Sequence, residues 1–179
     1  MRKVIRKVFF VWQFDKEEKW LNEMAAKGLA LVGVGYCRYE FEECDPGEYG
    51  LKIELLDNPP KHPESEQYIK FIESTGAEQV GSYMRWVYFR KKTADGPFDL
   101  FSDNSSRIKH LNRVLAFIAT IGGINLFSGV YNIVLYLIHH MSISLLGCIN
   151  IAIAIWTAFG YYRIWKQKKL LQKEQQLFE

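Results

Sequence analysis

The pattern of apolar and polar positions changes character well before the end of the chain. Up to residue 93, short apolar runs alternate with charged residues at the periods of strands and helices. Residues 114–162 then contain no Lys, Arg, Asp or Glu. About 20 consecutive apolar residues can cross the hydrocarbon core of a bilayer, and this stretch holds two such runs, separated by His139, His140 and Met141. We therefore expect a folded N-terminal domain followed by a two-helix transmembrane hairpin.

The N-terminal domain opens with a predicted strand and a predicted helix. Residues 4–12 are rich in Val, Ile, Phe and Trp, which favours a strand in the core of a sheet. Residues 15–27 predict a helix with Asp15 as its N-cap, because acidic and apolar positions follow at helical spacing. Gly28 is expected to adopt the left-handed conformation that commonly follows a helix C-terminus.

The rest of the domain predicts three more strands and one more helix. Residues 29–43 alternate with a period of two, and residues 49–55 predict their antiparallel partner across an Asp-Pro-Gly turn. Residues 64–74 predict a helix whose inward face includes Phe71, and residues 77–92 predict the last strand. The resulting order predicts an α+β fold of the ferredoxin-like βαββαβ type, with helices covering one face of an antiparallel sheet.

Such a fold leaves one sheet face without helices. Depending on strand register, this face would offer Tyr36, Arg38, Trp86 or Tyr88 as binding residues. Exposed aromatic side chains on a sheet can stack on nucleobases, or they can be covered by a second copy or another protein. The domain lacks the consensus strand of RNA-recognition domains, and its net charge is slightly negative. We therefore expect no direct binding of nucleic acid.

Charge is distributed unevenly between the two parts of the chain. Residues 1–97 hold 15 Lys and Arg against 16 Asp and Glu, whereas residues 98–179 hold 8 against 4. The basic residues of the second part flank the apolar runs, and none lies in the connecting turn; they include Arg107, Lys109, Arg113, Arg163, Lys166, Lys168 and Lys169. Positive charge accumulates on the cytoplasmic side of membrane helices. This predicts a multi-pass plasma-membrane protein with both termini in the cytoplasm.

These patterns together predict five segments. They are a soluble domain (1–93), a juxtamembrane linker (94–110), transmembrane helix 1 (111–138), transmembrane helix 2 (142–165) and a cytoplasmic helical tail (166–179). No cleaved signal peptide is expected, because the first apolar stretch is short and is interrupted by acidic residues.

Each predicted transmembrane helix carries small and polar residues on one face. The candidates for helix interaction are Asn125, Ser128 and Asn132 in the first helix, and Asn150, Ala154 and Ala158 in the second. Small residues allow close helix approach, and polar side chains can bond between helices, contributing about 0.6 kcal/mol each. These residues could join the two helices of one hairpin, or they could mark a face for self-association or for a partner helix. A transport pathway is not favoured, because the spans carry no charged residue.

The sequence carries little catalytic chemistry. Cys37, Cys44 and Cys148 have no metal-binding or redox spacing, and the carboxylates are scattered. No phosphate loop, nucleophile elbow or zinc motif is present. The adjacent His139 and His140 are read as a tight turn rather than an acid sensor or metal site. We therefore expect no catalytic residues, no cofactor, no metal and no enzymatic activity.

Several segments resemble one family of bacterial membrane proteins, known as domain of unknown function 2812. The matching segments are FDKEEKWLNEMAAKGL (14–29), YEFE (39–42), PGEY (46–49), RWVYFRK (85–91), LFSD (100–103) and SRIK (106–109). The resemblance covers about residues 4–113. It implies a membrane protein of a Gram-positive type bacterium, often encoded beside PadR-like transcriptional regulators, and it supplies no catalytic residues.

Three functions remain open from the sequence. The first is a membrane-anchored cytosolic sensor or regulator that binds another protein, for which a PadR-like regulator is one candidate. The second is an accessory subunit of a membrane transporter or export complex. The third is a small-molecule-binding domain at the membrane surface. In each case the lipid bilayer and a protein partner, or self-association through the hairpin, are the expected contacts.

Overall fold

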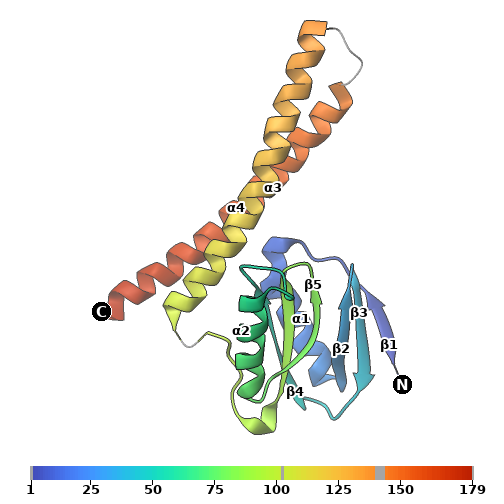
Figure 1. Ribbon diagram of the computed structural model, residues 1–179, viewed down its shortest axis with the longest axis vertical. Coiled ribbons are helices and arrows are strands. Elements are labelled where there is room, and N and C mark those ends of the chain that lie inside the picture. Colours follow the sequence, from blue (N-terminus) through green and yellow to red (C-terminus); the bar gives the residue numbers. More distant parts are fainter. Residues whose placement is uncertain (1, 102, 140–143, 179) are drawn as a thin grey trace. The chain divides into compact units, whose positions relative to one another are not determined.

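The computed structural model describes residues 2–101, 103–139 and 144–178 (Figure 1). The chain forms two units, Met1–Asp103 and Asn104–Glu179. The first unit is an α+β domain, and the second consists of two long helices. The predicted α+β class is confirmed, and so is the presence of two long apolar helices at the C-terminal end.

The described residues of the α+β domain form six strands, whereas the sequence predicted four. In chain order its elements are β1 (Lys3–Arg6), α1 (Phe14–Ala26), β2 (Leu29–Gly35), β3 (Arg38–Glu43), β4 (Tyr49–Leu55), α2 (Pro63–Ser74), β5 (Glu78–Tyr83) and β6 (Trp86–Lys92). Two short 3-10 helices precede α1 and follow β6, at Val11–Gln13 and Thr93–Asp95. The strands form two antiparallel sheets with the orders β1-β3-β2 and β4-β6-β5.

The domain is a tandem repeat of one βαββ unit. In each half, a strand and a helix are followed by a hairpin, and the last strand of the hairpin lies between the other two strands. Gly28 and Gly76 end the two helices with φ of 79° and 87°, values that favour glycine. The second strand of each half also has a register irregularity at the same place, between Leu31 and Gly33 and between Gln79 and Gly81.

The two extra hairpins explain the difference from the predicted strand order. Residues 29–43 and 77–92 each alternate with a period of two, but each folds back on itself after Gly35 and after Tyr83. The turns use Cys37 at φ 50° and Met84 at φ 54°, which are unusual for residues other than glycine or asparagine. The turn residues, 36–37 and 84–85, include no Gly, Asn, Asp or Pro. The alternation of apolar and polar residues therefore continues through both turns, and the sequence gives no sign of them. As a further correction, β4 pairs with β6 rather than with the strand that precedes it.

Helix α1 forms the main core of the domain. Leu21 and Ala25 on α1 pack against Leu31 of β2, Phe41 of β3 and Ile53 of β4, and all five side chains are buried. Both sheets therefore use α1 as a common core helix. The helix begins at Phe14 with Gln13 as its N-cap, so Asp15 lies inside its first turn and is not the cap.

Helix α2 covers the opposite face of the second sheet. Ile69 and Ile72 pack on Val87 and Phe89 of β6, a strand whose intervening Tyr88 belongs to the α1 core. The predicted inward position of Phe71 is wrong, because its side chain is 62% exposed. The second sheet is thus covered by a helix on both faces, so the open face expected from the sequence is absent from this sheet.

The two sheets meet at β2 and β5. A Cβ added at Gly81 would lie 3.1 Å from the backbone N of Val34, so any other residue here would require β2 to shift by a few tenths of an ångström. Arg90 of β6 joins the sheets further along: its Nη1 donates to Leu31 O at 3.1 Å, and it forms ion pairs with Glu42 and Glu78 at 3.3 and 2.9 Å. The domain is therefore one body with a shared core.

The second unit is a pair of antiparallel helices, α3 (Asn104–His139) and α4 (Ser144–Phe178), which pack side by side along their length (Figure 1). Helix α3 starts within the predicted linker, and α4 continues without interruption through the predicted tail. Met141 and His140, expected in the connecting turn, lie outside the described residues, as does Ser142 at the predicted start of helix 2.

Candidate functional site

A buried carboxylate joins the two halves of the α+β domain. Glu17, in the first turn of α1, is 8% exposed. Its Oε1 accepts hydrogen bonds from the hydroxyls of Tyr39, on β3 of the first sheet, and Tyr88, on β6 of the second, at 2.7 and 2.6 Å. The three side chains therefore hold both sheets against α1.

The environment of Glu17 shifts the proton affinity of all three groups. Burial raises the pKa of Glu17 above its ordinary value, against the hydrogen bonds from Tyr88 and Tyr39, which lower it. Burial also raises the pKa values of both tyrosines, and the charge of Glu17 adds to this effect. Both hydroxyls thus stay protonated and act as donors. This arrangement suits a structural anchor, because the two hydrogen bonds and the packing enclose the carboxylate.

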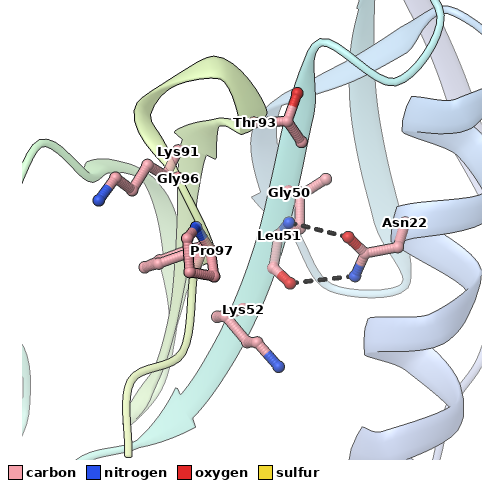
Figure 2. A pocket seen from close by; sticks show the side chains of 9 residues that line it. Asn22, Gly50, Leu51, Lys52, Lys91, Thr93, Gly96 and Pro97 are labelled. Carbon is pink, nitrogen blue, oxygen red and sulfur yellow. Dashed lines mark hydrogen bonds between the residues drawn. The ribbon is translucent and has the colours of Figure 1, made fainter.

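The free edge of β4 is closed by side chains of α1. The side-chain amide of Asn22 donates to Leu51 O at 3.0 Å and accepts from Leu51 N at 2.9 Å (Figure 2). Glu18 accepts from the backbone N of Ile53 at 3.1 Å and from Lys52 Nζ at 2.9 Å. Edge strands pair readily with foreign strands unless they are covered, so these contacts make β4 a poor template for strand addition.

A shallow cleft of about 560 Å³ lies between the edge of β4 and the segment that follows β6 (Figure 2). Its lining residues are Asn22, Gly50, Leu51, Lys52, Lys91, Thr93, Gly96, Pro97 and Phe98. Two of them, Lys52 and Lys91, carry positive charge, but Lys52 is engaged with Glu18 and the amide of Asn22 with Leu51. The cleft can admit a small anionic molecule, with Lys91 as the second cation of its lining.

The tips of the two hairpins carry an exposed aromatic patch. Tyr36, in the β2–β3 turn, is 78% exposed, and its ring centroid lies 6.0 Å from that of Tyr83, at the end of β5. Met84 in the adjoining turn is 64% exposed. We call Tyr36, Tyr83 and Met84 the tip patch. Because β2 and β5 approach closely at Gly81, the patch draws on both halves of the domain.

The other predicted open-face residues lie elsewhere. Arg38 is exposed on β3 and pairs with Glu40 at 2.9 Å. Trp86 stacks on Phe14 with ring centroids 5.8 Å apart and packs against the main core. Tyr88 is buried beneath α1, so it is not available at a surface. Of the four candidates, only Tyr36 and Arg38 are exposed, because α1 covers the face to which Tyr88 belongs.

Glycines determine how closely α3 and α4 approach. A Cβ added at Gly129 would lie 2.8 Å from Ile151 Cδ1, and one added at Gly147 would lie 2.9 Å from Ile133 Cγ1. A Cβ at Gly122 would lie 2.7 Å from Thr157 Oγ1. Close packing through small residues is typical of helix pairs in membranes. We call these three glycines with Ala154 and Thr157 the seam.

The predicted helix-interaction residues are divided between the seam and its borders. The side-chain amides of Asn125 and Asn132 donate to carbonyls of their own helix, Ile121 O at 2.8 Å and Ser128 O at 2.7 Å. Ser128, like both asparagines, is half-buried. These hydrogen bonds satisfy the amide donors locally, as expected for polar side chains in an apolar setting.

In the second helix, the predicted interaction residues Asn150, Ala154 and Ala158 do not all lie in the seam. Ala154 is buried and Asn150 is half-buried, but Ala158 is exposed. The buried positions instead include Gly147, Ala154 and Thr157, because residues that face a neighbouring helix recur about every 3.5 positions rather than every four. Ala158 borders an apolar groove of about 390 Å³ between the two helices.

Sequence reasoning missed the Glu17 centre and, apart from Tyr36, the tip patch. The repeat Gly-x-x-x-Val-Gly at 28–33 and 76–81 was the available signal, since it marks equivalent places in the two halves. Within the described part of the chain, no three His, Cys, Asp or Glu side chains are grouped so that they could hold a metal ion.

Comparison with known proteins identifies the chain by family. The family described as protein of unknown function (DUF2812) matches residues 13–122, from the start of α1 to the middle of α3. Comparisons with curated proteins and with solved structures give no match. Since the family covers more than half of the residues, the chain belongs to the family of proteins of unknown function DUF2812.

Proposed function

We propose that this protein is a membrane-anchored regulatory module that works by binding another protein rather than by catalysis. In this proposal the hairpin crosses the plasma membrane, and the α+β domain and both termini lie in the cytoplasm. The observation that carries the proposal is the inverted order of side chains in the hairpin. Between residues 119 and 160, the buried positions of the described helices are all small residues, whereas many large apolar residues face outward.

The outward faces support insertion in lipid. The exposed apolar side chains include Ile124, Phe127, Val130, Leu137, Leu145, Ile155 and Phe159, with exposed fractions from 50% to 75%. Only 22% of the most apolar window of each helix is buried. A core helix of a soluble protein would bury most of such a window, and patches of this size on a soluble surface would drive association. Lipid is the solvent that suits these faces.

The basic ends of the helices support the orientation. All Lys and Arg residues of the second unit lie in residues 104–113 and 163–178, at the same end of the antiparallel pair. Under the positive-inside rule this end belongs to the cytoplasm. The α+β domain immediately precedes α3 and would be on the same side.

The tip patch supports recognition of a protein. Tyrosine and methionine are enriched in interfaces because each combines a large contact area with adaptable packing. Tyr36 and Tyr83 come from different halves of one rigid domain, so their relative position does not depend on the partner. The family resemblance makes a PadR-like transcription regulator the first partner to test.

A photo-crosslinking amino acid at position 36 tests the proposal in living cells. We expect a discrete adduct of defined mass when the crosslinker replaces Tyr36. The control is the same replacement at Phe71, an exposed aromatic residue on α2 outside the tip patch, where we expect no equivalent adduct. Mass spectrometry of the adduct identifies the partner. The same adducts from both positions, or none from position 36, would contradict recognition through the tip patch.

A second candidate function is binding of a small anionic molecule in the cleft beside β4. The volume of the cleft and the presence of Lys91 favour it. Thermal unfolding of the purified protein with a panel of anionic metabolites would show a ligand-dependent shift that Lys91→Gln abolishes. A shift that survives this substitution would argue against the cleft.

A further inference from the structure

The cytoplasmic end of the proposed hairpin is a concentrated cationic surface. Its members are Arg107, Lys109 and Arg113 on α3, and Arg163, Lys166, Lys168, Lys169 and Lys173 on α4, and we call them the basic collar. The contacts of Gly122 with Thr157 and of Gly129 with Ile151 fix the antiparallel pairing. Continued along the helices, this pairing brings the start of α3 beside the end of α4, as Figure 1 shows.

The collar lies outside the apolar part of the hairpin. Helix α3 has 36 residues, which at 1.5 Å per residue is a length of about 54 Å, whereas the hydrocarbon core is about 30 Å thick. Residues 104–113 of α3 and 163–178 of α4 therefore extend beyond the hydrocarbon. They do so as ordered helices, so their charges are held in place rather than spread along a flexible tail.

Aromatic side chains mark the boundary between the two parts of α4. Tyr162 and Trp165 stack with ring centroids 6.1 Å apart, and Lys169 Nζ lies 5.8 Å from the centre of the Trp165 ring. Tyrosine and tryptophan prefer the level of the lipid headgroups. Lys173 is eight residues beyond Trp165, or about 12 Å along the helix. A charge on the lipid headgroups acts over about one Debye length, about 8 Å at physiological salt, beyond the headgroup layer. Lys173 lies within that range.

The exposed lysines that α4 contributes to the collar share one face of this helix. Lys166, Lys169 and Lys173 are spaced by three and four residues and are all exposed. Glu174 is the acidic residue beside them. On the opposite face of α4, Ile164 is buried and Leu171 is half-buried, so the cationic stripe faces away from the helix pair.

We propose that the basic collar binds anionic phospholipid headgroups and gives the protein a preference for acidic lipid in the leaflet at that end. This inference rests on membrane insertion of the hairpin, which is part of the proposed function. Each Lys or Arg near an acidic surface contributes about 1 kcal/mol, which corresponds to about a fivefold change in partitioning. Three lysines on one face should therefore change the preference by at least about tenfold after screening by salt.

The test compares lipid retention by the full-length protein. The protein is placed in nanodiscs of phosphatidylcholine, or of phosphatidylcholine with a third replaced by phosphatidylglycerol, and the retained lipids are counted by native mass spectrometry. We expect phosphatidylglycerol to be enriched on the wild type. The combined variant Lys166→Gln, Lys169→Gln and Lys173→Gln should lose this enrichment about tenfold. A control with the same charge change on the domain, Lys16→Gln, Lys19→Gln and Lys70→Gln, should retain it.

Each alternative outcome has a separate meaning. Failure to enter discs of phosphatidylcholine alone would contradict the membrane anchor, and the lipid assignment with it. Normal insertion without enrichment, or equal loss in the control variant, would overturn the lipid assignment alone. Binding of duplex DNA through the same three lysines, without enrichment of phosphatidylglycerol, would overturn it in favour of nucleic acid.

Discussion

The α+β domain and the helical hairpin differ in the size of the side chains that they bury. In the domain the largest of the fully buried side chains are those of Phe41 and Phe89. In the hairpin the buried positions include Gly129 and Ala154, while Phe127 is 75% exposed. Water drives large apolar groups together, but lipid gives no such drive, so helices in lipid approach through small residues. This contrast is the one expected if water surrounds the domain and lipid surrounds the hairpin.

The largest predicted effect comes from placing a charge on the outward face of the hairpin. Phe127→Arg puts a cation near the middle of α3, which costs about 2.5–3.5 kcal/mol of insertion free energy. We expect most of the protein to be lost from alkali-washed membranes, as quantified by immunoblotting. Phe71→Arg, at an exposed aromatic residue of the domain, should leave the membrane fraction unchanged. Equal loss in both variants would remove the distinction between the two regions.

The seam should be sensitive to added volume at one glycine and tolerant at another. Gly129→Leu collides with Ile151, whereas a Cβ at Gly123 meets nothing within 4 Å. Overpacking typically costs about 1–3 kcal/mol. We expect Gly129→Leu to lower the thermal aggregation midpoint in mild detergent, and Gly123→Leu to leave it nearly unchanged. The reverse order would mean that the helices pack through a different face.

The domain should depend on the two tyrosine hydroxyls that bond Glu17. Tyr88→Phe and Tyr39→Phe each remove one donor from a buried carboxylate, at a cost of about 1–3 kcal/mol. Urea unfolding followed by tryptophan fluorescence measures the change, with Trp20 lying 5.0 Å from the Tyr39 ring as a nearby reporter. Since both donors reach the same Oε1, the effects should be non-additive. Strict additivity would argue against a shared centre.

Glu17 should also make the domain's stability depend on pH. Burial raises the pKa of Glu17 in the folded state above the ordinary value of 4.5. The folded state therefore binds the proton more tightly than the unfolded state, and stability falls as pH rises from about 4.5 through the raised pKa. Urea titrations of wild type and Glu17→Gln across this range should show the fall only in the wild type. A parallel pH dependence in both would assign the effect to another group.

The smallest effect on stability is predicted at the tip patch. Tyr36→Ser removes an aromatic ring that is mostly exposed, so the free energy of unfolding should change by no more than about 0.5 kcal/mol. Recovery of a partner in co-purification should nevertheless drop strongly. A large loss of stability would show that Tyr36 serves the fold, and an unchanged yield of partner would remove the patch as a recognition surface.

Much of this architecture follows from local pattern, and the exceptions have physical causes. The helices around Leu21 and Ile69 were predictable because apolar spacing and the terminal Gly28 and Gly76 agree. The hairpin turns at Cys37 and Met84 were not, because these residues rarely adopt positive φ. Strand pairing follows from such turns, so missing them led to four predicted strands in place of six.

The candidate sites also divide into residues that the local sequence could indicate and residues whose role depends on contacts distant in sequence. Tyr36 was a candidate because the alternating run placed it on an uncovered sheet face; it is exposed, but it lies in the turn between β2 and β3. Glu17 could not be found in this way, because its significance depends on two tyrosines from different sheets. Tyr88 was misplaced for the same reason: whether its face is open depends on where α1 packs, and that contact is distant in sequence.

The central claim is that lipid surrounds the outward faces of α3 and α4, and cysteine labelling tests it most directly. In a background with Cys37, Cys44 and Cys148 replaced by Ser, single cysteines are introduced as Phe127→Cys, Ile155→Cys or Phe71→Cys. The membranes are made permeable so that the reagent reaches both faces. They are then treated, without detergent, with a water-soluble maleimide. We predict rapid labelling at position 71 and almost none at 127 and 155 until detergent is added. Labelling of all three positions at similar rates without detergent would contradict the account.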